Sequence, residues 1–187
     1  NNKKLFSSWG LWLSGLITMS SVANGVALVT GASAGLGFET CRQLAFQKGV
    51  TKVILACRNK ERAEKAIADL IKKTDQNKDF FEVIILDTAD NKSCRAAASQ
   101  LGQLDLVLLN AGSIPTGDPF ELTAAGSTNL FATFTLGHAV FIEELISASK
   151  LSDGARVVFS GSEMSLGAKL DWFCKETTPE DGFALHI

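Results

Sequence analysis

One short stretch constrains the fold of this chain more than any other: an apolar run that breaks at a glycine-rich turn and continues into a helical pattern. The run from Val26 to Val29 predicts a buried strand, and the turn carries Gly31, Gly35 and Gly37. We expect Gly31 to permit a tight turn, Gly35 to let the backbone approach a diphosphate, and Gly37 to let the helix pack on the strand. The free N–H groups of the first helical turn attract an anion, with the positive end of the helix dipole behind them. The stretch therefore predicts a nucleotide-binding strand-turn-helix.

Length and composition fit a single α/β domain with a sizeable core. The chain has 187 residues, 46% of them apolar, and a net charge of −2, which gives no indication of a nucleic-acid partner. Four scattered cysteines form no C-x-x-C pair, so we interpret them as reduced structural residues and expect no metal site: Cys41, Cys57, Cys94 and Cys174. The chain contains 12 Phe and no Tyr, an imbalance that bears on the chemistry below.

Residues 1–24 are expected to be an extension outside the nucleotide-binding domain, which we place at residues 25–187. Lys3 and Lys4 precede a moderately apolar stretch at residues 5–19. Three interpretations stay open for it: translated upstream sequence, a targeting segment, or a membrane anchor shorter than the roughly 20 apolar residues that a spanning helix needs. Membrane association through residues 5–19, a cytoplasmic location and an organellar one (plastid or endoplasmic reticulum surface) are therefore all open.

Further along the chain, apolar runs alternate with helical stripes, a pattern typical of a parallel sheet. A helix after Gly37 is expected to end at Gly49, and Asn59 is expected to cap the next one. Helices are also expected at 91–101 and over most of 121–149, the latter with an apolar face made of Leu130, Phe134, Phe141, Leu145 and Ile146. Expected strands after the first are 53–56, 81–86, 104–109 and one beginning at 154.

The residues after the second strand bear on the choice of cofactor. An acid about twenty residues beyond the glycines would accept a hydrogen bond from a ribose 2′-hydroxyl. This chain has Cys57 and Arg58 there, and a planar guanidinium suits a 2′-phosphate, which an acid would repel. NADP(H) is therefore favoured over NAD(H), with Lys60 and Arg62 adding to the positive field. The alternative is that Arg58 is a solvated residue at a strand end.

Two motifs in register resemble those of the short-chain dehydrogenase/reductase family: Thr30-Gly-Ala-Ser-Ala-Gly-Leu-Gly37 and, after the fourth strand, Asn110-Ala-Gly112. The resemblance spans residues 24 to about 163. Within the family, Leu-Ala-Cys-Arg58 and Leu-Gly-His138 look like the retinol dehydrogenase and protochlorophyllide reductase group. The resemblance implies an α/β fold, a doubly wound parallel sheet (Rossmann fold), of which this chain holds the N-terminal five-strand portion in the order 3-2-1-4-5.

The resemblance also implies which residues contact the cofactor. Asp87 is expected at the adenine amino group, with the alternative that it only ends the third strand, and Asn110 beside the ribose. The full set is Gly31, Ser33, Ala34, Gly35, Leu36, Gly37, Arg58, Asp87, Asn110, Ala111 and Gly112.

The activity that the resemblance implies is hydride transfer between the nicotinamide and a carbonyl, alcohol or activated alkene of a small-molecule substrate. Ser162 is the implied catalytic serine, whose hydroxyl would hydrogen-bond the substrate carbonyl, and Ser160 is the fallback. Phe134 stands where the family has a catalytic asparagine, and we expect His138 to pack in the helix instead of acting as a base.

The family's proton donor, the tyrosine of a Tyr-x-x-x-Lys motif, has no counterpart in these 187 residues. Two explanations stay open: a C-terminal truncation that removes the sixth and seventh strands, or a natural pseudoenzyme that serves as a non-catalytic NADP-binding module. Either way we expect the chain as it stands to be inactive. A truncation would also leave an apolar helix face and a strand edge open, which favours poor solubility or a homo-oligomer. Reading the coding sequence past Ile187 distinguishes the two.

Overall fold

The computed structural model describes residues 25–112, 122–123 and 126–161, over which strands and helices alternate. In chain order the elements are β1 (Gly25–Thr30), α2 (Gly35–Leu44), β2 (Val50–Cys57), α3 (Lys60–Thr74), the 3₁₀ helix η1 (Lys78–Phe80), β3 (Phe81–Ile85), α4 (Asn91–Gln100), β4 (Leu104–Leu109), α5 (Asn129–Phe131), the π-helix η2 (Ala132–Leu136), α6 (Gly137–Ser147) and β5 (Leu151–Phe159).

The five strands form one parallel sheet in the order β3-β2-β1-β4-β5, which confirms the expected fold class and strand order. β1 is the central strand: Thr30 pairs with Ala56 of β2, and Val29 pairs with Leu108 of β4. After β3 the chain crosses to the far side of β1 and builds the sheet outward in the other direction. The strand order therefore reverses between β1 and β4, the point at which doubly wound sheets bind their ligands.

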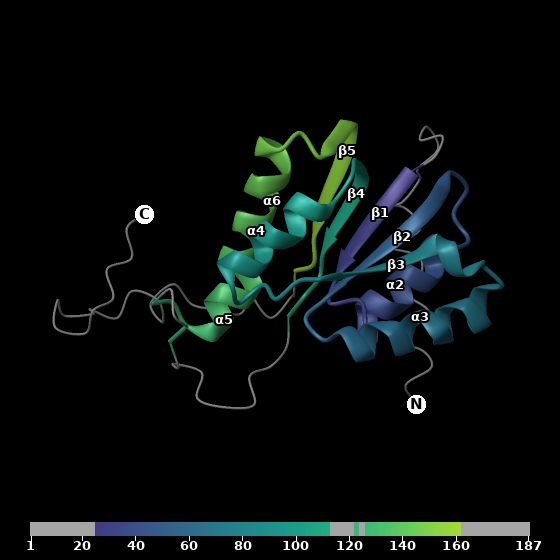
Figure 1. The fold of residues 1–187 in the computed structure, drawn as a ribbon, viewed down its shortest axis with the longest axis horizontal. Helices are drawn as coiled ribbons and strands as arrows, with labels where there is room; N and C mark the ends of the chain where they lie inside the picture. Colours follow the sequence, from purple (N-terminus) through teal and green to yellow (C-terminus); the bar gives the residue numbers. More distant parts are fainter. Residues whose placement is uncertain (1–24, 113–121, 124–125, 162–187) are drawn as a thin grey trace, which may run out of the picture.

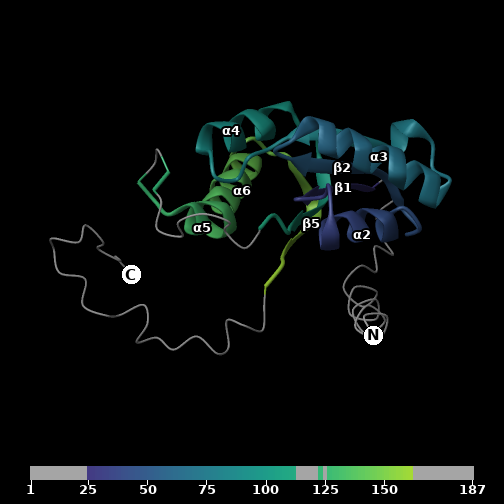
Figure 2. The same cartoon turned by 90° about the horizontal axis from the view of Figure 1, so that it is seen from below.

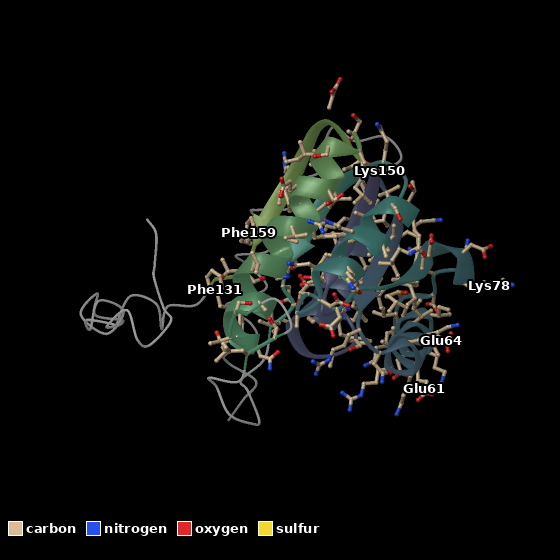
Figure 3. All side chains as sticks on the ribbon, turned by 60° about the vertical axis from the view of Figure 1, so that its left-hand side comes forward. Glu61, Glu64, Lys78, Phe131, Lys150 and Phe159 are labelled. Atoms are coloured by element: carbon tan, nitrogen blue, oxygen red, sulfur yellow. The ribbon has the colours of Figure 1, made fainter. Side chains whose placement is uncertain are left out.

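The helices are divided between the two faces of the sheet. α2 and α3 share one buried cluster with the sheet, and α4 and α6 share the other. Figures 1 and 2 show α4 and α6 side by side and apart from α2 and α3. On α3 the apolar face lies inward through Ala63, Ala66 and Leu70, whereas Glu61 and Glu64 point to solvent in Figure 3. The result is the three-layer arrangement typical of α/β domains.

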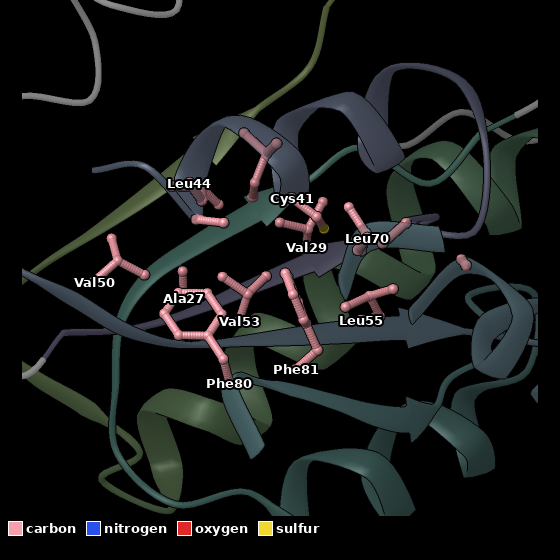
Figure 4. Close-up of a cluster of buried hydrophobic side chains, with 14 of the residues drawn as sticks. Ala27, Val29, Cys41, Leu44, Val50, Val53, Leu55, Leu70, Phe80 and Phe81 are labelled. Carbon is pink, nitrogen blue, oxygen red and sulfur yellow. The ribbon is translucent and has the colours of Figure 1, made fainter. Parts of the chain in front are cut away.

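Two buried clusters hold these layers together, and alternate residues of each central strand belong to different clusters. Ala27 and Val29 of β1 face α2 and α3, while Leu28 between them faces α4 and α6. The first cluster is drawn in Figure 4, where Val53 and Leu55 of β2 lie among side chains from both helices. A fully buried Val or Leu contributes about 1.5–3 kcal/mol relative to an exposed one. Parallel strands covered on both faces in this way explain the near-continuous apolar runs of the sequence.

Side-chain caps mark the starts of α3 and α4. The Asn59 side chain accepts a hydrogen bond from the Arg62 amide at 2.8 Å, which confirms the expected cap of α3. The Asp90 side chain accepts one from the Lys92 amide at 2.8 Å at the start of α4. Each of these side chains satisfies a backbone donor that the first turn leaves free.

Most of the range 121–149 is helical, as expected. The helix begins at Asn129, because the Thr128 side chain accepts a hydrogen bond from the Phe131 amide and caps it, and Leu122 forms an isolated antiparallel bridge with Thr128. The helical segment then runs to Ser147 through the π-turn of η2. Its expected apolar face is partly wrong, since Phe134 is 44% exposed and Ile146 is 61% exposed, whereas Phe141 and Leu145 are fully buried.

Three other boundaries differ from the expectation. The helix after the glycine turn ends at Leu44, and Gly49 lies beyond it at φ +89°, in the turn that leads into β2. β2 is longer than expected, and β5 begins at Leu151 instead of Gly154. At both strands the backbone pairing of the sheet extends past the apolar run that marked the strand.

Candidate cofactor-binding site

Parallel strands bring the residues that follow them to one edge of the sheet. Gly31 follows β1, Arg58 follows β2, Asp87 lies two residues after β3, and Asn110 follows β4. The Gly31 amide donates to the Ala56 carbonyl at 2.8 Å, so the glycine turn is attached to the end of β2. The structure thus brings the predicted cofactor residues of four strands to the carboxyl edge, around the switch point between β1 and β4.

Two glycines of the motif, Gly31 and Gly37, have no space for a side chain. Gly31 has φ +66°, and a Cβ there would lie 2.8 Å from the Ala111 Cα, so both backbone conformation and space exclude a side chain. A Cβ on Gly37 would lie 2.5 Å from the Gly31 carbonyl oxygen and 2.8 Å from the Asn110 Nδ2. These contacts agree with the expected tight turn at Gly31 and with close packing of α2 on the strand at Gly37.

The start of α2 differs from the starts of α3 and α4. Its N-cap residue, Ala34, makes no side-chain hydrogen bond, whereas Asn59 and Asp90 cap α3 and α4. No acidic residue lies in its first turn, which is also true of α4. Gly35, at φ +57°, has open space where a Cβ would stand, and Ala34 and Leu36 are exposed, with Ser33 partly exposed. First-turn amides that no side chain caps, beside open space, form an arrangement that fits a diphosphate.

The Thr30 side chain joins the glycine turn to the end of β4. Its Oγ1 accepts hydrogen bonds from the backbone amides of Asn110 and Ala111, each at 2.8 Å, and the Asn110 Nδ2 donates to the Thr30 carbonyl at 3.1 Å. Thr30 is part of the glycine motif, but the sequence analysis assigned it no role. The available signal was a hydroxyl in the last position of a strand that is otherwise apolar, where it needs a hydrogen-bond partner.

Arg58 lies at the end of β2 and is exposed, as are Lys60 and Arg62 in the first turn of α3. Lys60 lies 3.8 Å from Glu64, an exposed pair that leaves its charge largely in solvent. Within residues 25–112, 122–123 and 126–161 no hydrogen bond or ion pair engages the Arg58 guanidinium. Cys57, directly before it, is buried, and burial raises the pKa of its thiol, which keeps it protonated and unreactive.

Asp87 is half-buried and already takes part in a local turn. One carboxylate oxygen, Oδ1, accepts a hydrogen bond from the Ala89 amide at 3.0 Å, and the Asp87 amide donates to Ser93 Oγ at 3.0 Å. This turn fixes the side chain just past the third strand. The expected contact with adenine would use the remaining carboxylate oxygen, and stays a prediction.

On the far side of the switch point lie Gly112 and Phe134. A Cβ on Gly112 would be 2.2 Å from the Phe134 ring, so the ring packs directly on the backbone at the end of the Asn-Ala-Gly motif. Ser160 follows β5, is exposed, and its amide donates to the Leu109 carbonyl at 3.0 Å. Ser162, the expected catalytic serine, lies outside the described residues, as does the segment 5–19.

His138 is buried in α6, as expected for a residue that packs in the helix. Its Nε2 lies 3.2 Å from the Thr30 hydroxyl and its Nδ1 lies 3.3 Å from the Phe134 carbonyl oxygen. Burial lowers the pKa of His138 below its usual value of 6.5, although the Phe134 carbonyl acts in the opposite direction. His138 is therefore neutral at pH 7.

In the described part of the chain, one helical segment, Asn129–Ser147, has the length and composition to cross a membrane. This is weak support for a membrane role, because core helices of soluble proteins meet the same criterion. Phe141 and Leu145 of this segment are fully buried in the cluster shared with α4. Only 28% of the most apolar stretch of this segment is buried inside the structure, so one stripe of it, and not the whole segment, belongs to the core.

A sequence profile of the short chain dehydrogenase family matches residues 25–172. WW domain-containing oxidoreductase of Danio rerio is 39% identical over 140 residues, which cover 74% of this chain and 33% of that protein. Retinol dehydrogenase 11 of Mus musculus is 36% identical over 137 residues, covering 71% of this chain and 42% of that protein. Among solved structures, menthone neomenthol reductase from Mentha piperita matches with a TM-score of 0.62 and 29% identity, covering 77% of this chain and 62% of that one.

The profile match runs through the glycine turn, the five strands and the end of β4. The chain spans less than two thirds of the length of its curated relatives, for example 55% of a short-chain dehydrogenase of Penicillium roqueforti and 28% of (-)-isopiperitenone reductase of Mentha piperita. The strand order and the motif at the switch point agree with the profile. The chain belongs to the short-chain dehydrogenase family, a family of oxidoreductases that use a nicotinamide cofactor.

Proposed function

We propose that this chain forms the cofactor-binding part of an NADP(H)-dependent short-chain oxidoreductase acting on a small molecule. The observation that carries the proposal is the edge of the sheet around β1 and β4. There the uncapped start of α2, the open space at Gly35 and the Asn110–Gly112 backbone meet. When bound, the nicotinamide supplies or accepts a hydride. The chain's own residues bind the dinucleotide and orient it at the switch point.

The preference for NADP(H) rests on charge at the end of β2. The exposed Arg58, with Lys60 and Arg62 in the next turn, gives a positive field where a 2′-phosphate would lie. No acid immediately follows the strand, since β2 ends at Cys57 and the next residue is Arg58. Glu61 and Glu64 belong to α3 and point to solvent (Figure 3).

Titration calorimetry with NADPH and NADH tests this preference. The unsubstituted chain is expected to bind NADPH at least about tenfold more tightly than NADH, a difference of about 1.4 kcal/mol. Arg58→Asp is expected to remove the preference, because it places an acid beside the extra phosphate. Lys48→Asp is the matched control, since Lys48 is an exposed cation that precedes β2 at the opposite edge of the sheet. Equal affinity of the unsubstituted chain for the two cofactors contradicts the role of Arg58.

The substrate site of the proposed enzyme would lie beside the nicotinamide, at the ends of β4 and β5. Ser162 is proposed to hydrogen-bond the substrate carbonyl, or Ser160 in its place. The transferred hydride would reach a carbonyl or an activated alkene, or leave an alcohol in the reverse direction. Names of relatives such as retinol dehydrogenase and menthone neomenthol reductase describe dehydrogenase or reductase chemistry in those proteins.

A second candidate is a non-catalytic module that binds NADP(H) without turnover. It is favoured by Phe134, whose ring packs on Gly112 at the position where the family has a catalytic asparagine. A phenyl ring neither donates nor accepts the hydrogen bonds that an asparagine makes. NADPH binding combined with no oxidation of NADPH by ketones, aldehydes or enones supports the module. Oxidation that depends on such a substrate supports the enzyme.

A further inference from the structure

His138 links three elements that are distant in the sequence. It lies at the start of α6 and is 2% exposed, and its ring nitrogens contact Thr30 of β1 and the Phe134 carbonyl of η2. The Thr30 hydroxyl in turn holds the backbone amides of Asn110 and Ala111 at 2.8 Å. A continuous hydrogen-bond chain therefore runs from the π-turn of the helix, through His138, to the ends of β1 and β4.

Counting donors fixes the direction of every bond in this chain. A threonine hydroxyl has two lone pairs and one proton. Both lone pairs of Thr30 Oγ1 receive backbone amides, so its proton is the group that faces His138 Nε2, at 3.2 Å. Nε2 must then accept, and the ring proton must lie on Nδ1, where it is donated to the Phe134 carbonyl at 3.3 Å. Neither the other tautomer nor the imidazolium satisfies the chain.

The surroundings of the ring are apolar on the side that the hydrogen bonds leave free. The Phe159 ring of β5 meets the His138 ring edge-on, with centroids 6.4 Å apart and planes at 80°. Among the described residues no buried side-chain nitrogen or oxygen lacks a partner, so this network is complete. Losing the Nε2 acceptor would leave the Thr30 hydroxyl proton buried without a partner, and the hydroxyl would have to rotate away from the two amides.

We propose that His138 is a positioning residue for the cofactor site: it orients the Thr30 hydroxyl, which fastens the Asn110–Ala111 backbone against the glycine turn. The inference rests on the proposed function, because this backbone lines the site that would hold the cofactor ribose. It also gives the buried histidine a role distinct from acid-base catalysis. His138 acts at a distance from the reacting atoms, through Thr30 and two peptide groups.

The ring tautomer is the first test. In the full chain labelled with ¹⁵N-histidine, the nitrogen shifts of His138 at pH 7 are expected to show a neutral ring with the proton on Nδ1. A proton on Nε2, or a charged ring at that pH, overturns the proposal. This measurement needs no substitution, so it decides the hydrogen-bond chain even if a variant fails to fold.

A pair of variants of similar size separates the hydrogen bond from the packing. His138→Gln keeps an amide oxygen as a strong acceptor at the end of the side chain, whereas His138→Met leaves only a thioether sulfur, which accepts weakly. The Asn110 and Ala111 amides are expected to exchange with solvent at least about tenfold faster in the Met variant and within about threefold of the original rate in the Gln variant. Equal exchange rates in the two variants overturn the proposal.

Cofactor binding supplies a separate readout, with NADPH as the probe. Its Kd is expected to rise about tenfold in His138→Met and to stay within about threefold in His138→Gln. In a Thr30→Val background the Met substitution is expected to add nothing, because the hydroxyl on which His138 acts is gone. If the unsubstituted chain binds no NADPH, the proposed function fails, while the amide exchange still decides the role of His138. An equal rise of Kd in the Gln and Met variants overturns that role.

Discussion

The two halves of the sheet, called here the β1–β3 side and the β4–β5 side, differ in how completely they are packed. β1 and β2 are almost entirely buried, and the helices that follow them, α2 and α3, cover them. β5, at the opposite edge, has no fully buried residue, and Phe159 at its end is 61% exposed. Phe131 is 48% exposed and lies on the same side of the molecule as Phe159 in Figure 3.

This contrast follows from how each side of the sheet is covered. The β1–β3 side is built from consecutive strand-helix units, each of which buries its own strand, and it carries the glycine turn and Arg58. On the β4–β5 side, α4 and α6 cover one face, and apolar side chains stay exposed at the edge. Within the described residues β5 pairs with β4 alone, and exposed aromatic residues beside such a strand edge are typical of a surface that packs against further protein. The half of the sheet that carries the nucleotide-binding residues is thus the more completely packed one.

The largest expected effect comes from the glycine turn on the first side. Gly37→Ala is expected to weaken NADPH binding about 100-fold, or about 2.7 kcal/mol, because the new Cβ would displace the Gly31 carbonyl and the Asn110 side chain. Gly102→Ala, in the loop before β4 where a Cβ meets nothing within 4 Å, is the control and should bind normally. Calorimetry checks both. Unchanged affinity in Gly37→Ala would show that the cofactor does not use this turn.

A matched pair of valines compares the packing of the two sides directly. Val53→Ala in β2, fully buried, is expected to lower the free energy of unfolding by about 2–3 kcal/mol, through lost burial and the cavity it leaves. Val158→Ala in β5, which is only partly buried, is expected to cost less than about 1 kcal/mol. Urea unfolding of both variants measures the difference. Equal losses would mean that the β5 side is as tightly packed as the β1–β3 side.

The smallest expected effect is a pH dependence that arises at the junction of the two sides. Because burial lowers the pKa of His138 below 6.5, the unfolded chain binds a proton in a pH range in which the folded chain does not. The neutral His138 therefore contributes fully to stability above pH 6.5. Its contribution decreases as the pH falls, by at most about 1.4 kcal/mol per pH unit.

Urea unfolding at pH 7.5, 6.5 and 5.5 checks this slope, with His138→Gln as the control that should flatten it. Glu39, whose pKa is lowered mainly by its hydrogen bond with Arg42, contributes a loss of stability only near and below its usual value of 4.5. The range between pH 5.5 and 7.5 therefore reports on His138. A slope of the same size in the Gln variant would assign it to another group.

Much of the fold could be predicted because local patterns and packing agree. Short apolar runs bounded by glycine, asparagine and aspartate marked the strands, and the Asn59 cap and the apolar stripe of α3 were correct in detail. The order of the strands followed from the family resemblance, and the structure confirms it. The end of α2 and the starts of β2 and β5 were misplaced, because backbone pairing and turn geometry set those boundaries, and hydrophobic periodicity reports on neither.

The site was predicted less completely, since its parts meet only in three dimensions. The sequence indicated the residues at the strand ends, and the parallel sheet brings Gly31, Arg58, Asp87 and Asn110 to one edge. It did not indicate that Thr30 and His138, 108 residues apart, form one hydrogen-bond chain. Nor did it indicate that Phe134 packs on Gly112, a contact that depends on the π-turn and on where the helix begins.

The central claim is that the start of α2 holds the diphosphate of a dinucleotide. A crystal structure of the chain with NADPH tests this most directly. Diphosphate oxygens are expected within about 3 Å of the backbone nitrogens of Leu36 and Gly37, with the 2′-phosphate beside the Arg58 guanidinium. A cofactor bound elsewhere, with the glycine turn filled by side chains of the protein, would contradict the account.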